Sequence, residues 1–204
     1  MVNVGSNANR RPLKSRSMRW AAAATRAVLA TGLSANQISF LGILVAALGS
    51  WAFIEAPTRP LLFIAAAACI QLRLLANMLD GLVAVEGGRG GPTGAIWNEF
   101  PDRIEDSLLL VAAGYAGELP WLGWLCALLA ATCAYVRLLG ASLGQPQDFS
   151  GPMAKPHRMA ALTVGCLIAT LWFGGLQVAL GVIAAGTVGT ISRRLVHLSK
   201  ALRA

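Results

Sequence analysis

The sequence has 204 residues, of which 56% are hydrophobic and only 13% are charged. A soluble domain usually has about 25% charged residues, so this composition excludes an ordinary soluble protein and indicates an integral membrane protein. The net charge of +8 would suit nucleic acid. In a membrane protein it favours basic loops held at the anionic cytoplasmic face, and we expect no nucleic-acid partner.

The chain begins with a basic segment. Residues 1–14 are polar and basic, and from 15 to about 30 arginines alternate with Trp, Ala and Leu. This pattern is typical of an amphipathic helix lying at the membrane interface. A secretory signal peptide is the alternative, but Arg26 interrupts the short apolar run and favours the interfacial helix. We therefore expect a basic region with a juxtamembrane helix over 1–32 and a transmembrane region over 33–204.

Six apolar stretches follow, each close to the ~20 residues that a helix needs to cross a bilayer. Turn-forming residues such as the Gly-Gly-Arg-Gly-Gly run at 87–91 separate them. The sequence thus predicts an all-α integral membrane protein with six transmembrane helices preceded by an amphipathic interfacial helix. The expected spans are 36–54, 61–85, 94–116, 121–143, 158–173 and 176–196.

Lys and Arg gather in the N-terminal segment, the 86–93 loop, the 144–158 loop and the C-terminal tail, whereas the other three loops together contain only Arg59. With six spans, these four basic segments lie on one side of the membrane. The positive-inside rule makes that side cytoplasmic. We predict a multi-pass protein of a bacterial inner or plasma membrane, with both termini in the cytoplasm.

Acidic residues are concentrated on either side of the 86–93 loop. Six of the nine Asp and Glu residues lie between positions 77 and 106. Ionisable groups in membrane segments are costly and mark functional sites. At about 100° per residue, each of the two helices carries one polar stripe, and the short loop predicts that the stripes face each other. The stripes are Arg73, Asn77, Asp80 and Ala84 on one span, and Gly94, Asn98, Asp102 and Asp106 on the next.

Oxygen ligands of this kind suit a hard cation, Mg²⁺ or Mn²⁺, with phosphate oxygens or water completing its coordination. Such cations stabilise the charge on a leaving phosphate, and a neighbouring carboxylate can accept a proton from an attacking hydroxyl. The alternative is that the carboxylates only form ion pairs within the bundle, with Arg73, Arg89 and Arg103 as partners.

These residues resemble the signature of the CDP-alcohol phosphatidyltransferases, D-x-x-D-G-x-x-A-R, about eight residues, then G-x-x-x-D-x-x-x-D. The start of the first span, Ser34 to Ser39, is similar to the P-N-x-x-T of that family. Asn77 and Asn98 stand where the signature has its first and third aspartates, and Val85 where it has arginine. The chain is therefore identified as a variant member. The matching positions are Asp80, Gly81, Ala84, Gly94 and Asp102.

The resemblance implies a membrane phosphotransferase of phospholipid biosynthesis and makes 33–204 the catalytic region. A phosphatidyl or similar group would pass from a CDP-alcohol such as CDP-diacylglycerol to a hydroxyl of an alcohol acceptor, releasing CMP. Asp102 would be the general base. The resemblance places the metal at Asn77, Asp80, Asn98 and Asp102, and the nucleotide at Asp80, Gly81, Ala84 and Gly94.

Further residues are candidates for the same site. Glu99 and Asp106 would restore negative charge to the metal, and Arg89 or Arg103 would replace the missing arginine. Lys155, Arg158 and Arg137 would bind a phosphate on the acceptor, or would simply be positive-inside anchors. Family analogy also implies a homodimer in the lipid bilayer.

Two other functions are compatible with the same residues. A small cation or metal transporter would use the same carboxylates as an ion pathway, but would give no reason for the spacing of Gly81, Ala84 and Gly94. A non-catalytic CDP-lipid-binding relative would agree with the two asparagines. CMP release separates both from the enzyme.

Overall fold

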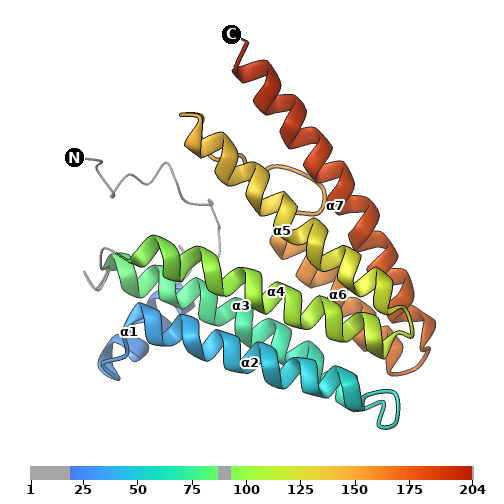
Figure 1. Ribbon diagram of the computed structural model, residues 1–204. Coiled ribbons are helices and arrows are strands. Elements are labelled where there is room, and N and C mark those ends of the chain that lie inside the picture. The colour runs from blue at the N-terminus through green and yellow to red at the C-terminus, as the bar shows by residue number, and fades with distance from the viewer. Residues whose placement is uncertain (1–18, 87–92, 204) are drawn as a thin grey trace.

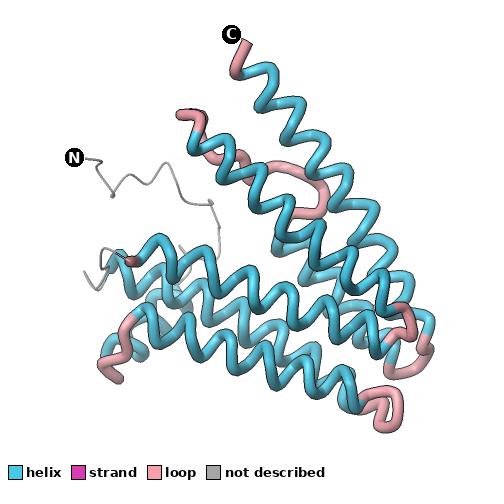
Figure 2. Tube along the Cα trace, viewed as in Figure 1, coloured by secondary structure: helices cyan, strands magenta, loops and turns pink. Residues whose placement is uncertain are grey.

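The computed structural model describes residues 19–86 and 93–203, and within these ranges every regular element is a helix (Figure 1, Figure 2). The all-α prediction is confirmed. The basic residues before position 19 and the loop arginine Arg89 lie outside the described residues. The helices are α1 Arg19–Ala30, α2 Ala35–Glu55, α3 Leu62–Glu86, α4 Gly94–Ala116, α5 Pro120–Ser142, α6 Lys155–Ala169 and α7 Gly174–Ala201.

Four of these helices are long and apolar enough to cross a membrane: α2, α3, α5 and α7. This shows an integral membrane protein. The polar stripe in α4 and the 15-residue length of α6 set these two helices apart from the other four. Helices are present at all six predicted spans. Among the described residues, however, length and hydropathy identify only four of them as candidate membrane spans, so the prediction of six transmembrane helices is confirmed only for these four.

The helices form two groups that meet at one end and diverge at the other (Figure 1). One group is α2, α3 and α4; the other is α5, α6 and α7. Contacts between α4 and α5 and between α3 and α6 join them. α3, α5 and α7 run toward the diverging end, and α2, α4 and α6 run away from it (Figure 1). The start of α4, with its acidic residues, and the start of α6, with Lys155, therefore both point toward the side on which the two groups open.

Local sequence sets several helix ends. Ser34 caps α2: its side chain accepts a hydrogen bond from the Gln37 amide at 3.3 Å, and the Gln37 side chain accepts one from the Ser34 amide at 2.9 Å. This reciprocal capping box satisfies two amides that the helix leaves unpaired. Pro120 and Pro156 lie in the first turns of α5 and α6, where a missing N–H costs nothing.

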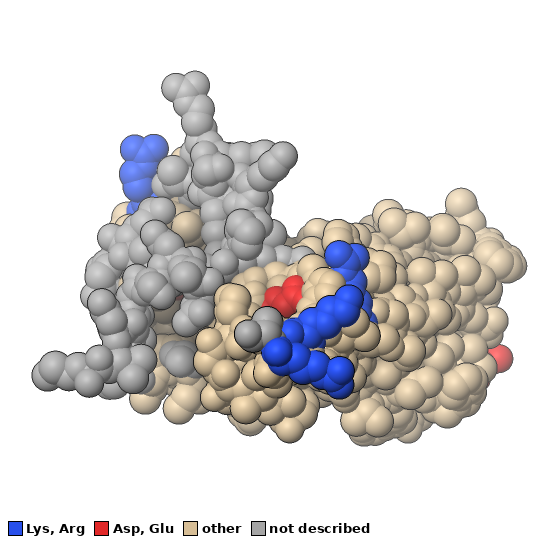
Figure 3. Space-filling view, turned by 90° about the horizontal axis from the view of Figure 1, so that it is seen from above, with Lys and Arg blue, Asp and Glu red and all other residues tan. Residues whose placement is uncertain are grey.

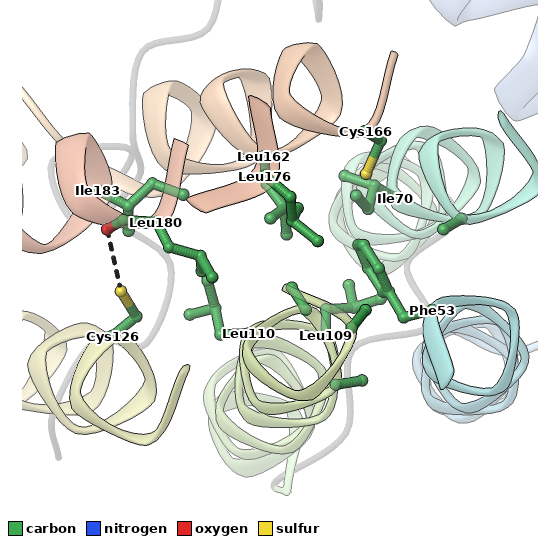
Figure 4. Close-up of a cluster of buried hydrophobic side chains, with 14 of the residues drawn as sticks. Phe53, Ile70, Leu109, Leu110, Cys126, Leu162, Cys166, Leu176, Leu180 and Ile183 are labelled. Carbon is green, nitrogen blue, oxygen red and sulfur yellow. Dashed lines mark hydrogen bonds between the residues drawn. The ribbon is translucent and has the colours of Figure 1, made fainter. Parts of the chain in front are cut away.

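The apolar core lies where the two groups meet, and all six helices from α2 to α7 contribute to it. Phe53, Ile70, Leu109, Leu162 and Leu180 belong to it and are almost entirely buried (Figure 4). A smaller cluster packs α1 against the second half of α3 and the start of α2. The core thus joins α3 and α4 at the end where the two groups meet. At the other end of α3, α1 packs beside the polar stripe.

Candidate active site between α3 and α4

The polar stripes of α3 and α4 face each other through Asn77. Its amide nitrogen donates to the Asp102 carboxylate and, at 3.0 Å, to Oε2 of Glu105. One neutral side chain of α3 therefore bridges two carboxylates that lie three residues apart on α4. Two neighbouring carboxylates repel each other unless a donor or a cation lies between them, and the Asn77 amide is such a donor.

Asp80 lies on the next turn of α3 and contacts α2. The Ser39 hydroxyl donates to its Oδ2 atom at 2.7 Å, and the residue is only 7% exposed. Its Oδ1 atom is buried without a hydrogen-bond partner. A buried carboxylate oxygen with no donor is costly, which indicates that a cation or donor belongs beside it.

Asp102 is more accessible, with a side-chain exposure of 19%. The Lys155 ammonium at the start of α6 contacts its Oδ1 atom, and Arg103 lies 3.5 Å from Oδ2. Asn98, one turn closer to the open end of α4, is exposed, and a Cβ at Gly94 would meet open space. Asp102 therefore lies between the buried part of α4 and its open start.

One turn deeper, charged side chains join three helices. Arg73 of α3 donates to Oε2 of Glu105 at 2.7 Å and also to Asp106. Arg158 of α6 donates to the other oxygen of Asp106 at 2.7 Å. All four side chains are almost completely buried. Glu105 and Asp106 therefore form ion pairs within the bundle, as the alternative interpretation of the acidic residues predicts, and these pairs join α3, α4 and α6.

The three cations predicted to bind the acceptor all reach the acidic stretch. Lys155 contacts Asp102, and Arg158 contacts Asp106. Arg137 of α5 lies 2.6 Å from the Glu99 carboxylate, contacts Gln147, and stacks over the Phe149 ring with 5.2 Å to the centroid. Figure 3 shows, on the face seen from above Figure 1, Lys and Arg side chains beside a small exposed patch of acidic atoms.

The donor set suits a hard divalent cation only in part. Among the described residues no three His, Cys, Asp or Glu side chains gather closely enough to hold a metal. Mg²⁺, however, is usually bound by one or two carboxylates together with substrate phosphates and water. Asp80 and Asp102, supplemented by asparagine amide oxygens, provide that set, and the unpaired Oδ1 of Asp80 is a fitting ligand atom.

Two contacts could not be expected from the sequence pattern alone. Ser39 lies in the first turns of α2, and in the sequence it stands out only as part of the segment that is similar to the P-N-x-x-T of the family. In the structure its hydroxyl donates a hydrogen bond to Asp80. Glu105 lies outside the predicted stripe of α4, yet it contacts both Asn77 and Arg73. Gly42, one turn beyond Ser39, is the residue of α2 that leaves room for Glu105, because a Cβ there would lie 2.5 Å from Glu105 Oε1.

No protein-family model matches the sequence. The chain is 33% identical over 163 residues to the archaetidylinositol phosphate synthase of Aeropyrum pernix, with 78% of each chain covered. It is 25% identical over 186 residues to the phosphatidylinositol phosphate synthase of Mycolicibacterium smegmatis, which covers 83% of this chain and 79% of the relative.

The fold is similar to solved structures of the phosphatidylinositol phosphate synthase PgsA1 of Mycobacterium tuberculosis. With CDP-DAG bound, that protein matches at a TM-score of 0.76 and 22% identity over 89% of this chain and 94% of its own. In complex with manganese and citrate it matches at 0.73, over 85% and 86%. At this identity the likeness concerns the fold. The sequence match to the archaeal synthase spans most of both chains, and the chain therefore belongs to the CDP-alcohol phosphatidyltransferases, membrane enzymes that move a substituted phosphate group from a CDP-alcohol to a second alcohol.

Proposed function

We propose that the site between α3 and α4 transfers a phosphatidyl or related phospho-alcohol group from a CDP-alcohol such as CDP-diacylglycerol to a hydroxyl of a second alcohol, releasing CMP. The observation that carries this proposal is the pair Asp80 and Asp102, held on facing helices by Ser39, Asn77 and Lys155. A structural neighbour crystallised with CDP-DAG supports the choice of donor.

Asp102 is the general base. Its Oδ1 atom is engaged by Asn77 and Lys155, whereas Oδ2 has only the 3.5 Å contact with Arg103 among the described residues. Oδ2 is therefore the atom that takes the proton from the acceptor hydroxyl. The partial exposure of Asp102 lets the hydroxyl reach it from the open end, which the buried Asp80 does not allow.

Asn77, Asp80, Asn98 and Asp102 would hold Mg²⁺ or Mn²⁺, and the bound cation would supply positive charge to the diphosphate and to the leaving CMP. A neighbour crystallised with manganese supports the choice of metal. Asp80, Gly81, Ala84 and Gly94 line the nucleotide position. Glu99 and Asp106, the additional ligands expected from the sequence, lie at the same helix pair but hold Arg137, Arg73 and Arg158.

The acceptor carries a phosphate, as a phosphorylated polyol such as inositol phosphate does. Lys155 and Arg137, with side-chain exposures of 20% and 10%, are the cations that receive it. Arg158, which is paired with Asp106, adds positive charge behind them. The similarity to an archaetidylinositol phosphate synthase and to a phosphatidylinositol phosphate synthase supports this class. Lys155 is the first contact, because its ammonium lies beside Asp102 and would place the bound acceptor next to the base.

The helices α2 to α7 all cross the membrane, α1 lies at its interface, and both termini and the site face the cytoplasm of a bacterial cell. The clustering of basic residues at the diverging end supports this orientation. Residues 1–32 form the basic juxtamembrane region and 33–204 the catalytic region. Two copies associate as a homodimer by analogy with the family.

The test is CMP release by the purified protein with CDP-diacylglycerol, Mg²⁺ or Mn²⁺ and a panel of acceptors, with the lipid product identified by mass. The panel includes inositol phosphate, inositol, glycerol 3-phosphate and serine. We expect CMP with a phosphorylated acceptor, and none from the Asp102→Asn variant at an unchanged melting temperature. Absence of CMP with every acceptor would exclude the transfer and leave a CDP-lipid-binding relative, which the two asparagines favour.

A further inference from the structure

The metal site of this chain lacks two of the four carboxylates of its family signature, because Asn77 and Asn98 replace aspartates. Asp80 and Asp102 alone would carry the negative charge, and Lys155 already offsets part of the charge of Asp102. Two carboxylates, with phosphate oxygens and water, are enough to bind a hard cation, and a further carboxylate beside this pair would strengthen the binding.

Three other acidic side chains of α4 are near enough to consider. Asp106 is engaged at both oxygens, by Arg73 and by Arg158. Glu99 lies 2.6 Å from Arg137, on the side of α5. Glu105 differs from both, because only its Oε2 atom is engaged and its Oε1 atom is buried with no hydrogen-bond partner.

The position of Glu105 connects it with Asn77. Its Oε2 atom accepts the Asn77 amide at 3.0 Å, and the same amide nitrogen donates to Asp102. Oε1 points to the space that Gly42 leaves on α2: a Cβ there would lie 2.5 Å from Oε1 and 3.4 Å from Asn77 Oδ1. A carboxylate oxygen and an amide oxygen thus both pack against Gly42, where the side chain of any larger residue would clash with Oε1.

We propose that Glu105 is a positioning residue of the metal site, and that its carboxylate, acting through Asn77 beside Asp102, replaces the charge that the signature places at position 77. In this chain the carboxylate is that of Glu105 on α4, in place of an aspartate at position 77 on α3. The neutral Asn77 amide lies between this carboxylate and Asp102. This inference rests on the proposed function, since it concerns the same cation. Partners that orient metal ligands typically account for about 10–100-fold in metal affinity.

The test measures Mn²⁺ affinity of the full chain in nanodiscs by electron paramagnetic resonance, with the melting temperature and CMP release recorded in parallel. We expect Glu105→Gln to weaken Mn²⁺ binding about 10–100-fold. Asn77→Asp in the Glu105→Gln background should return most of that affinity, because it restores a carboxylate at the signature position. Glu55→Gln, at the other end of α2, serves as the matched control and should bind as the wild type does.

A purely structural role for Glu105, as a partner of Arg73, predicts a lower melting temperature and unchanged Mn²⁺ affinity in the folded fraction. That result, with Asp80→Asn still losing Mn²⁺, would overturn the inference. So would a loss of affinity in Glu105→Gln that Asn77→Asp does not recover. CMP release by the wild type is scored separately, so a failure of this inference is distinguishable from a failure of the transfer itself.

Discussion

Asp106 provides the sharpest test of how the buried charges support the fold. It accepts hydrogen bonds from Arg73 and Arg158, and the three side chains have exposures of 3%, 0% and 2%. Asp106→Asn preserves the shape and removes the charge. Arg73 keeps Glu105 at 2.7 Å, but Arg158 is left with the Met153 carbonyl at 3.5 Å. Removing one partner of a buried pair costs about 3–5 kcal/mol, and we expect a loss of that size.

The assay is the free energy of unfolding in mixed micelles. Arg158→Met should cost less than Asp106→Asn, because Asp106 still pairs with Arg73. The double variant should be no less stable than Asp106→Asn, since it leaves no uncompensated Arg158. The control, Glu99→Gln, breaks a partly exposed pair and should cost about 0–1 kcal/mol. If Asp106→Asn lies within about 1 kcal/mol of the wild type, the assignment of a structural role to this network is refuted.

Three further predictions concern contacts at other places in the fold. Ser39→Ala removes the donor at 2.7 Å from Asp80 and should lower stability by about 1–3 kcal/mol, and it should weaken Mn²⁺ binding in a titration. Gly123→Ala places a Cβ 2.7 Å from the Gly114 Cα atom. Backbone cannot yield, so α5 must move away from α4, and thermal melts should show a loss of about 1–3 kcal/mol. Burial alone would raise the pKa of Asp148. Hydrogen bonds with Ser150 in the same loop and with His197 of α7 outweigh burial and hold the pKa of Asp148 below its ordinary value. Its contribution to stability is therefore present at neutral pH and lost as the pH falls through that lowered pKa, and Asp148→Asn should flatten the acid side of a melting-temperature profile.

The helices could be predicted because their signal is local. Apolar runs of about 20 residues mark spans wherever they occur, and the predicted bounds of α2 to α5 lie within a few residues of those found. The last helix was predicted to end at 196 and continues to Ala201, because hydropathy reports contact with lipid and not where backbone hydrogen bonding stops. Helix α6 begins at Lys155, before the apolar residues, with Pro156 in its first turn.

The partners of the site residues could not be predicted in the same way. Lys155 is separated from Asp102 by 53 positions and Ser39 from Asp80 by 41, so these contacts depend on how the two helix groups pack. The spacing of the polar stripes indicated which residues share a face of one helix. It contained no information on which cation of α6 would meet which carboxylate of α4.

The acidic residues of α4 change in accessibility along the helix, and this gradient separates folding from chemistry. Asp106 is deepest and fully paired with arginines, so it is unable to serve a substrate. Glu105 is equally buried but keeps one oxygen free of partners. Asp102 is partly exposed and held by a lysine and an amide, and Asn98 is exposed. Substrate entering at the diverging end would therefore meet Asn98 first and Asp102 next, with the arginine-bound carboxylates anchoring the helix behind them. A loss of charge at Asn98 is tolerable in this order, since solvent and diphosphate oxygens reach that position, whereas the charge missing at Asn77 is, in the proposed arrangement, replaced by the buried neighbour Glu105.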